Sequence, residues 1–402
     1  MSVSDRPRLL VAKGAFEAMG GAERDLIRVL PAINRLFDVT MASIQPSPEL
    51  ERTCAENGIL LLSPENKWKI STDPLSTILD SNRGTASSAW GSCDGLEEAM
   101  ESSMALHLVS GDGSLPILDH VPTDLRVHLH LLEPHRGLYE ETLHRKVDGT
   151  PRRNLALTKA ALSRARKRDR SLVGELMSRE GTIVSGNSRF SAKRANEVYG
   201  IEAGVLWPCV DTGEFPEDPV EDPDNPYPGT DEYVVSIGRA SYAKGTWETI
   251  SMLSGTGLSL AHIGGGDGES IGLLESHAES QGVGVWFAPR LESSELVSVM
   301  RSARAVVSMA HNESFGLTPI ESFAVGTPAL FVDEGGFRET IIDGKNGRLI
   351  GRDDIEGWHS ALDQASRPAN REEWAENGRA RISELKLTPD DHAQRIWELI
   401  CE

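Results

Sequence analysis

The segment Ala305–Arg348 reads AVVSMAHNESFGLTPIESFAVGTPALFVDEGGFRETIIDGKNGR and carries most of the information about the fold. Its first six residues, AVVSMA, predict a buried strand, which HNESFGL then ends. Thr318, Pro319 and Glu321 predict a helix, with threonine as N-cap, proline at the first helical position and glutamate closing a capping box. Glu313 and Glu321 are therefore expected on either side of a helix N-terminus.

Two carboxylates beside a helix N-terminus indicate a particular kind of ligand. The N-terminus carries unpaired N–H groups and partial positive charge, so it suits an anion. Carboxylates are useful there when they bind hydroxyl groups while the N–H groups bind phosphate. A nucleotide sugar offers both kinds of group. Taken alone, Glu321 is equally well explained as a capping residue with no part in binding.

The string ESFGLTPIESFAVGTP, with seven residues between Glu313 and Glu321, resembles the donor-site signature of family 4 glycosyltransferases, which are retaining enzymes with the GT-B fold. The later stretch GGFRETIIDGKNGRLI continues the resemblance. It implies that Glu313 contacts the hydroxyls of the donor sugar and Glu321 the ribose. It also implies that backbone N–H groups around Phe315, Gly316 and Leu317 meet the sugar and the phosphates.

The two halves of the 402-residue chain have similar patterns. The first opens with a strand at Arg8–Ala12 and a helix from about Ala22, and the second with a strand at Tyr233–Ile237 and a helix from about Thr246. Strands that alternate with helices predict an α/β fold with doubly wound parallel sheets. The resemblance implies the GT-B arrangement, in which two Rossmann-like domains face each other across a cleft.

These patterns give expected domain boundaries. We expect an N-terminal Rossmann-like acceptor domain over residues 1–212, an acidic proline-rich linker over 213–231, and a C-terminal nucleotide-sugar-binding domain over 232–386. A last helix within 387–402 is expected to pack back on the N-terminal domain. Residues 71–101 are polar and glycine-rich, and we interpret them as a loop-rich insertion.

Arg239 and Lys244 lie between the predicted strand and helix that open the second half. They resemble the GR-x4-KG element of the same family. A departing nucleoside diphosphate gains negative charge as the glycosidic bond breaks. The forked donors of arginine and the compact charge of lysine can together replace a metal ion. We therefore expect no cofactor and no metal. The alternative is a pair of ordinary surface cations.

Glycines follow two other predicted strands. Gly20 and Gly21 precede the first helix, where paired glycines let a ligand approach the backbone. The family resemblance places this loop near the donor phosphates and the acceptor, although a tight turn would need the same residues. Gly264 begins a glycine-rich turn after the strand at Leu258–Ile263 and resembles the GxG turn of the nucleotide domain.

The stretch Val127–His130 reads VHLH, and strand alternation places His128, His130 and Leu132 on one face. Family members carry a histidine near the anomeric carbon of the sugar. In this chain the matching string is displaced, with Leu132 where that histidine is expected. His130 is our candidate for the role, and a structural histidine is the alternative.

Composition limits the classes of function. The net charge is −20, which argues against a nucleic-acid-binding protein because phosphate backbones need a cationic face. The four cysteines have no spacing typical of a zinc site or a disulfide framework. No apolar run predicts a signal peptide or a membrane span. We therefore expect a cytoplasmic protein, or one that is peripheral at the inner face of the cell membrane.

One segment departs from the acidic character of the chain. Residues 152–170 read RRNLALTKAALSRARKRDR, with eight cations and one acid. A basic amphipathic helix of this kind can lie on an anionic membrane or hold a lipid-phosphate acceptor. It can equally be a solvated helix whose salt partners lie elsewhere in the chain.

The resemblance implies transfer of a sugar from a nucleotide-diphosphate sugar to an acceptor hydroxyl, with the glycan or lipid-linked acceptors of cell-surface glycan synthesis as the usual case. Catalysis would rest on positioning and charge stabilisation, with Glu313, Lys244, Arg239 and His130 at the reacting centre. Three alternatives stay open: a nucleotide-sugar 2-epimerase, a phosphorylase or sugar-phosphate synthase, and a non-catalytic binding or scaffold protein with the same fold.

Overall fold

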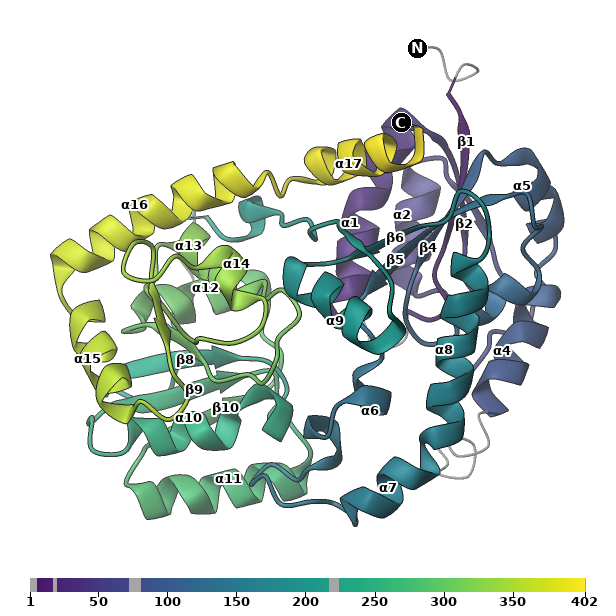
Figure 1. The fold of residues 1–402 in the computed structure, drawn as a ribbon. Helices are drawn as coiled ribbons and strands as arrows, with labels where there is room; N and C mark the ends of the chain where they lie inside the picture. Colours follow the sequence, from purple (N-terminus) through teal and green to yellow (C-terminus); the bar gives the residue numbers. More distant parts are fainter. Residues whose placement is uncertain (1–5, 17–19, 72–80, 217–223, 402) are drawn as a thin grey trace. The chain divides into compact units, whose positions relative to one another are not determined.

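The computed structural model describes residues 6–16, 20–71, 81–216 and 224–401. The chain forms two compact units, each built on one parallel sheet (Figure 1). The first unit comprises residues 1–139, 156–209 and 387–402, and the second comprises 140–155 and 210–386. Residues 140–155 thus lie with the second unit, although the expected boundary had placed them in the first. Residues 217–223 of the expected linker lie outside the described residues.

The first unit contains a seven-stranded sheet in the order β3-β2-β1-β4-β5-β6-β7, with every neighbouring pair parallel. The strands are β1 (Arg8–Ala12), β2 (Asp38–Ala42), β3 (Leu60–Leu62), β4 (Ala105–Val109), β5 (Arg126–Leu132), β6 (Ile183–Gly186) and β7 (Gly204–Val205). The helices are α1 (Gly21–Leu36), α2 (Pro48–Glu56), α4 (Ser81–Gly91), α5 (Leu96–Ser102), η2 (Leu115–Asp119), α6 (Arg136–Tyr139), α7 (Leu155–Ala161), α8 (Ser163–Met177), α9 (Arg189–Tyr199) and α17 (Pro389–Cys401).

The second unit contains a six-stranded parallel sheet in the order β10-β9-β8-β11-β12-β13. The strands are β8 (Tyr233–Ile237), β9 (Ser259–Ile263), β10 (Val285–Ala288), β11 (Val306–Ser308), β12 (Ala329–Val332) and β13 (Arg348–Ile350). The helices are η3 (Thr142–His144), η4 (Thr212–Glu214), η5 (Tyr242–Lys244), α10 (Thr246–Leu253), α11 (Gly268–Gln281), α12 (Ser293–Ser302), α13 (Thr318–Val325), α14 (Phe337–Thr340), α15 (Ile355–Ala365) and α16 (Pro368–Leu385).

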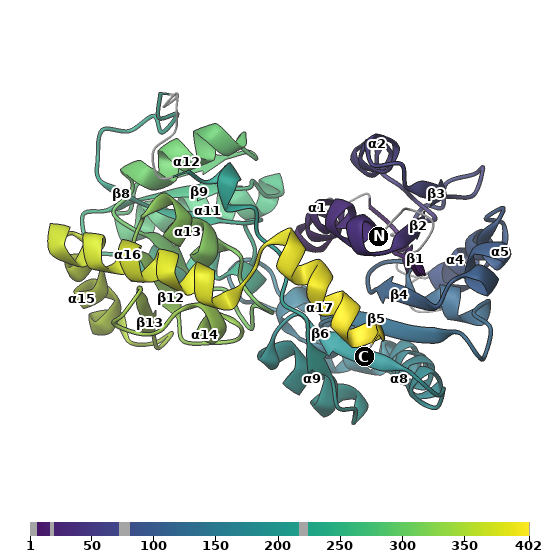
Figure 2. The same cartoon turned by 90° about the horizontal axis from the view of Figure 1, so that it is seen from above.

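Both sheets carry helices on their two faces. In the second unit, α10 and α11 lie on one face and α12 and α13 on the other (Figure 1), while α16 runs along α13 (Figure 2). In the first unit, alternation along β1 directs Leu9 and Val11 into a core shared with α1 and α17, and Leu10 and Ala12 into a second core shared with α4, α5 and α8. Each unit is therefore a doubly wound Rossmann-like domain.

The C-terminal helix α17 packs against α1. Its apolar face, which includes Ala393, Ile396 and Ile400, is buried in the core of the first unit. Trp397 packs on Phe37 with ring centroids 5.0 Å apart. The last residues of the chain thus complete one face of the first sheet, far in sequence from the strands that they cover.

The interpretation of residues 71–101 as a loop-rich insertion was wrong for the part that the structure describes, and residues 72–80 lie outside that part. Helices α4 and α5 fill most of the segment. Ala86, Trp90, Leu96 and Met100 are buried in the core. Their helical spacing is broken by many Ser and Gly residues, so the apolar side chains decide the structure although the composition resembles a loop.

The interior of the first unit holds a histidine cluster, defined as His107, His128, His130 and His392, all at most 2% exposed. The Nδ1 atoms of His107 and His128 are 2.9 Å apart, and Nε2 of His128 lies 2.8 Å from Ser185 Oγ. Burial lowers the pKa of His128 to about 3, and it also lowers the pKa of the other three below the ordinary value. These side chains are therefore neutral in the folded protein at pH 7.

This cluster makes stability depend on pH. In the unfolded chain each histidine takes a proton below about pH 6.5, so the free energy of unfolding should fall as the pH falls from 7 to 5. Each buried histidine contributes a slope of up to about 1.4 kcal/mol per pH unit. We expect His130→Asn to flatten the profile by about that slope relative to the wild-type profile. Urea denaturation at several pH values measures both profiles, and parallel profiles for wild type and His130→Asn would contradict the prediction.

Candidate active site

The strand order of the second sheet reverses between β8 and β11. In doubly wound sheets, ligands bind outside the carboxyl ends of the strands at such a switch point. The segment after β8 contains Arg239 and Lys244, and the segment after β11 contains Glu313. The topology therefore brings the two sequence motifs to one edge of the sheet.

An ion pair joins the two segments at this edge. Nζ of Lys244 lies 2.6 Å from Oε2 of Glu313, with the side chains 35% and 19% exposed. The stem of Lys244 passes over Gly238, where an added Cβ would lie 3.5 Å from three carbons of the lysine. An ion pair that solvent partly reaches contributes little to folding stability. Its value lies in holding a cation and a carboxylate side by side at the surface.

The two segments also meet through their backbones. Gly245 has φ of +66°, and a Cβ there would lie 2.0 Å from the carbonyl oxygen of Met309. The amide of His311 donates a 2.9 Å hydrogen bond to the carbonyl of Ala243. Only glycine permits this approach at position 245, so the residue after Lys244 is set by packing.

A second glycine pair supports the segment that carries Glu313. The amide of Gly336 donates a 2.7 Å hydrogen bond to the carbonyl of Glu313, and a Cβ on Gly336 would lie 2.4 Å from the carbonyl oxygen of Ser314. Gly316 has φ of +82° and packs against the ring of Phe337. The stretch Gly335–Phe337 thus packs against Glu313–Gly316.

The start of α13 differs from the expected capping box. Leu317 already has helical dihedral angles, and its carbonyl accepts hydrogen bonds from the amides of Ile320 and Glu321. Thr318 is therefore the first helical residue, and the helix has no side-chain cap. The predicted capping box was wrong because the helical conformation begins one residue earlier than the sequence pattern indicated.

Other candidates lie around the same edge. Gly264 has φ of +124°, and a Cβ there would lie 2.7 Å from the carbonyl oxygen of Gly238. Arg239 is exposed, and its side chain forms no hydrogen bond or ion pair with the residues that the structure describes. Glu321 lies in the first turn of α13 and is partly buried. The geometry brings Lys244 and Glu313 into contact, while Arg239 lies in the loop between β8 and Lys244.

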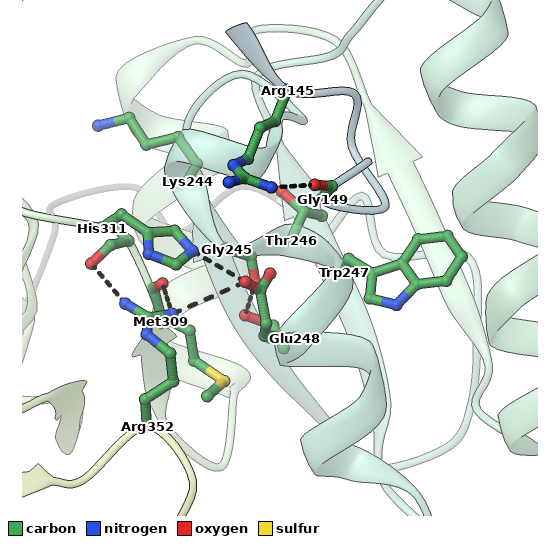
Figure 3. Close-up of polar contacts among 12 residues, drawn as sticks. Arg145, Gly149, Lys244, Gly245, Thr246, Trp247, Glu248, Met309, His311 and Arg352 are labelled. Atoms are coloured by element: carbon green, nitrogen blue, oxygen red, sulfur yellow. Dashed lines mark hydrogen bonds and ion pairs between the residues drawn. The ribbon is translucent and has the colours of Figure 1, made fainter. Parts of the chain in front are cut away.

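Three residues at this site were not predicted from the sequence: Glu248, His311 and Arg352. Figure 3 shows His311 and Arg352 directed toward the carboxylate of Glu248. Its Oε1 lies 2.8 Å from Nε2 of His311 and 3.9 Å from Nη1 of Arg352. No motif marks these residues, because each comes from a different segment and only the fold places them together.

The candidate residues of the first unit lie at two places. Gly20 caps α1, and Gly21 begins it; residues 17–19 lie outside the described part. Oε2 of Glu23 accepts a 2.8 Å hydrogen bond from the amide of Gly20, and its Oε1 pairs at 3.0 Å with Lys13, which is 1% exposed. This buried ion pair fixes the glycine loop and was also missed from the sequence, although Lys13 directly follows an apolar strand.

His130 lies inside the first sheet, within the histidine cluster. The alternation that placed His128 and His130 on one face is present, with ring centroids 6.4 Å apart. It ends at Leu132, which has φ of +60° and coincides with a shift of register between β5 and β6. The role of His130 at the sugar stays a prediction, and its burial favours the structural alternative.

Two Rossmann-like domains with the same strand order define the GT-B class, and comparison with known proteins shows which sequences and structures the chain is similar to. The model of the family described as glycosyl transferases group 1 matches residues 218–381. The matched residues make up less than half of the chain and lie in the second unit, so it is the second unit that is similar in sequence to that family.

Similar sequences carry related names. The D-inositol 3-phosphate glycosyltransferase of Corynebacterium urealyticum is 32% identical over 127 residues, which cover 31% of this chain and 28% of that protein. The glycogen synthase of Mycobacterium tuberculosis is 31% identical over 169 residues, which cover 40% of this chain and 39% of that protein. The matches thus span well under half of either relative.

Some solved structures have a similar fold over nearly the whole length of this chain. Sucrose-phosphate synthase from Thermosynechococcus elongatus has a TM-score of 0.72 at 16% identity, with 98% of each chain covered. The Anabaena protein Alr3699/HepE, solved in complex with UDP and glucose, has a TM-score of 0.68 at 14% identity, with 98% of this chain and 100% of that chain covered. At these identities the likeness establishes the fold.

The close approach at Gly245 gives a test of the site geometry. Gly245→Ala should destabilise the protein by about 1–3 kcal/mol more than Gly282→Ala, because both positions are left-handed but only the first would be overpacked. Gly282 has φ of +67° and nothing within 4 Å of an added Cβ, so it is a matched control. Urea denaturation measures the difference, and equal losses would show that Met309 does not press on Gly245.

Proposed function

We propose that this protein is a retaining glycosyltransferase that moves a sugar from a nucleotide-diphosphate sugar to an acceptor hydroxyl. The observation that carries the proposal is the ion pair of Lys244 and Glu313 at the switch point of the second sheet. Lysine can pair with a diphosphate, and a carboxylate can accept hydrogen bonds from sugar hydroxyls, so together they match the two ends of a nucleotide sugar.

In the reaction we propose, negative charge moves onto the leaving diphosphate. The acceptor oxygen forms a bond to the anomeric carbon while the bond from that carbon to the diphosphate breaks, and the acceptor proton passes to a phosphate oxygen. The leaving diphosphate becomes more negative, so Lys244 and the exposed Arg239 stabilise it more than they stabilise the bound donor. Glu313 orients the sugar through its hydroxyls, and no carboxylate acts as a nucleophile.

The other assigned roles follow the same scheme. Glu321 would bind the ribose, and the backbone around Phe315, Gly316 and Leu317 would approach the sugar and phosphates. Gly264 would leave room for the nucleotide beside Gly238. The first unit would bind the acceptor, with the loop at Gly20 and Gly21 fixed by the buried ion pair of Lys13 and Glu23.

The proposal predicts a selective loss of turnover. Lys244→Ala and Glu313→Gln should each lower kcat/KM for sugar transfer by about 100-fold or more, because each removes a charge from the reacting centre. The unfolding midpoint should change little, since both side chains of the pair are partly exposed to solvent. Lys345→Ala changes an exposed lysine of the same unit and should keep full activity.

A panel of UDP-, GDP- and ADP-sugars supplies the assay. A donor that binds should raise the unfolding midpoint of the wild type, since ligand binding stabilises the native state by mass action. NMR of the product then reports the anomeric configuration. Full activity in either active-site variant would refute the assigned roles, an epimerised donor without acceptor would indicate a 2-epimerase, and binding without turnover would indicate a non-catalytic protein.

We also propose that residues 152–170 contact an anionic lipid surface that presents the acceptor. The segment forms two helices, α7 and α8, and not a single one. Helix α7 has no buried residue, and its Leu157 is 71% exposed. Lys159 and Arg164 are exposed nearby. Apolar exposure beside cations, in a chain of net charge −20, supports this contact. None of the described helices has both the length and the apolar character that a bilayer crossing requires.

Sedimentation with vesicles tests the lipid contact. We expect the wild type to pellet with vesicles that contain phosphatidylglycerol and not with pure phosphatidylcholine, and salt to weaken the binding by screening. Leu157→Asp should reduce binding by about tenfold, because it removes an apolar contact and adds a repelled charge. Leu60→Asp is the control, since Leu60 is 60% exposed but lies on β3. Equal binding of the two variants would contradict the contact.

A further inference from the structure

We propose that Glu248 is a positioning residue for the Lys244–Glu313 pair. Among the residues that the structure describes, Glu248 forms no hydrogen bond or ion pair with Lys244 or Glu313. It also matches no motif in the sequence. It lies in the first turn of α10, directly after the segment that carries Lys244. Only the predicted loss of turnover rests on the proposed function; the positioning of the pair does not.

The first step of the argument is the bond from Glu248 to the segment after β11. Oε1 of Glu248 lies 2.8 Å from Nε2 of His311, two residues before Glu313. The imidazole of His311 also stacks on the ring of Tyr242, with centroids 4.5 Å apart and planes 27° apart. Tyr242 lies two residues before Lys244 and Glu248 four residues after it, so the ring of His311 contacts residues on both sides of the lysine.

The second step is Arg352, which follows β13. Its guanidinium donates to both carboxylate oxygens of Glu334, at 3.0 and 2.8 Å, and to the carbonyl of Met309 at 2.7 Å. Nη1 of Arg352 lies 3.9 Å from Oε1 of Glu248. Glu248 therefore lies between an arginine that holds the start of the β11 loop and a histidine that holds its middle.

The third step is the state of the Glu248 carboxylate itself. Its side chain is 22% exposed, and its Oε2 is buried with no hydrogen-bond partner among the residues that the structure describes. A surface glutamate would turn both oxygens to water, which favours the charged group strongly. Here both His311 and Arg352 instead point toward Oε1 of Glu248 (Figure 3), which indicates that their contacts fix its conformation.

The fourth step is the support of Tyr242 from the other side. Arg145 lies over the Tyr242 ring, with its guanidinium carbon 5.8 Å from the centroid, and donates a 2.8 Å hydrogen bond to the carbonyl of Gly149. A Cβ on Gly149 would lie 2.9 Å from the tyrosine ring. The stack therefore cannot relax away from His311. Loss of Glu248 would remove a side-chain contact of His311 and so loosen the loop that carries Glu313.

The experiment compares Glu248→Ala with Glu248→Gln and with Glu275→Ala, an exposed glutamate on α11. We expect Glu248→Ala to lower kcat by about 10- to 100-fold, because misplacement of a catalytic pair by about 1 Å has effects of this size. The glutamine amide oxygen can still accept from His311, so Glu248→Gln should stay within about threefold of wild type. Glu275→Ala should equal wild type.

A double-mutant cycle separates positioning from a general loss of stability. If Glu248 acts by placing Glu313, then Glu248→Ala should cause no further loss in a Glu313→Gln background. The same loss in both backgrounds would overturn the proposal, as would wild-type kcat in Glu248→Ala. Circular dichroism at the assay temperature confirms that each variant is folded.

A second readout does not depend on sugar transfer. The rate of acylation of the Lys244 amine, measured by mass spectrometry, should rise by about two- to fivefold in Glu248→Ala, because a displaced loop weakens its ion pair with Glu313. Glu275→Ala should leave this rate unchanged. An unchanged rate in Glu248→Ala would overturn the proposal, whereas a raised rate in a protein that transfers no sugar would keep the positioning and reject the proposed function.

Discussion

The second unit depends on one close contact, the approach of Gly245 to the carbonyl of Met309. Without it the segments after β8 and β11 would be separate loops at neighbouring strand ends. With it, the lysine before Gly245 and the glutamate four residues after Met309 meet as an ion pair. The contact is available only to glycine, and the strand order of the sheet places its two sides next to each other. The site is thus a consequence of topology and of one missing side chain.

Charge explains why such an arrangement suits sugar transfer from a nucleotide. The reaction creates negative charge on a phosphate, and preorganised cations lower its barrier without reorganising in the transition state. Lys244 is held by Glu313 before any ligand arrives, so its position requires little adjustment on binding. Its carboxylate partner is in turn next to where sugar hydroxyls would lie. Under the proposed function, the same contact would orient the sugar at one end of the donor and stabilise charge at the other.

Much of the fold could be predicted from the sequence, and the reasons are physical. Apolar runs such as Tyr233–Ile237 are strands because both faces of a parallel sheet are covered. The cap of α13 was mispredicted because the sequence does not reveal that Leu317 is already helical. Helices α4 and α5 were missed because Ser and Gly residues mask the spacing of their buried side chains. Glu248 and Arg352 were missed because their role comes from segments that only the fold brings together.

The central claim is that the segments after β8 and β11 form one binding site for a nucleoside diphosphate and its sugar. Hydrogen–deuterium exchange with saturating UDP, GDP or ADP tests it most directly, since bound phosphates protect the amides that they contact. The account predicts that the nucleotide that binds will slow exchange in both 238–248 and 309–321. Protection confined to other segments, or to only one of these two, would contradict it.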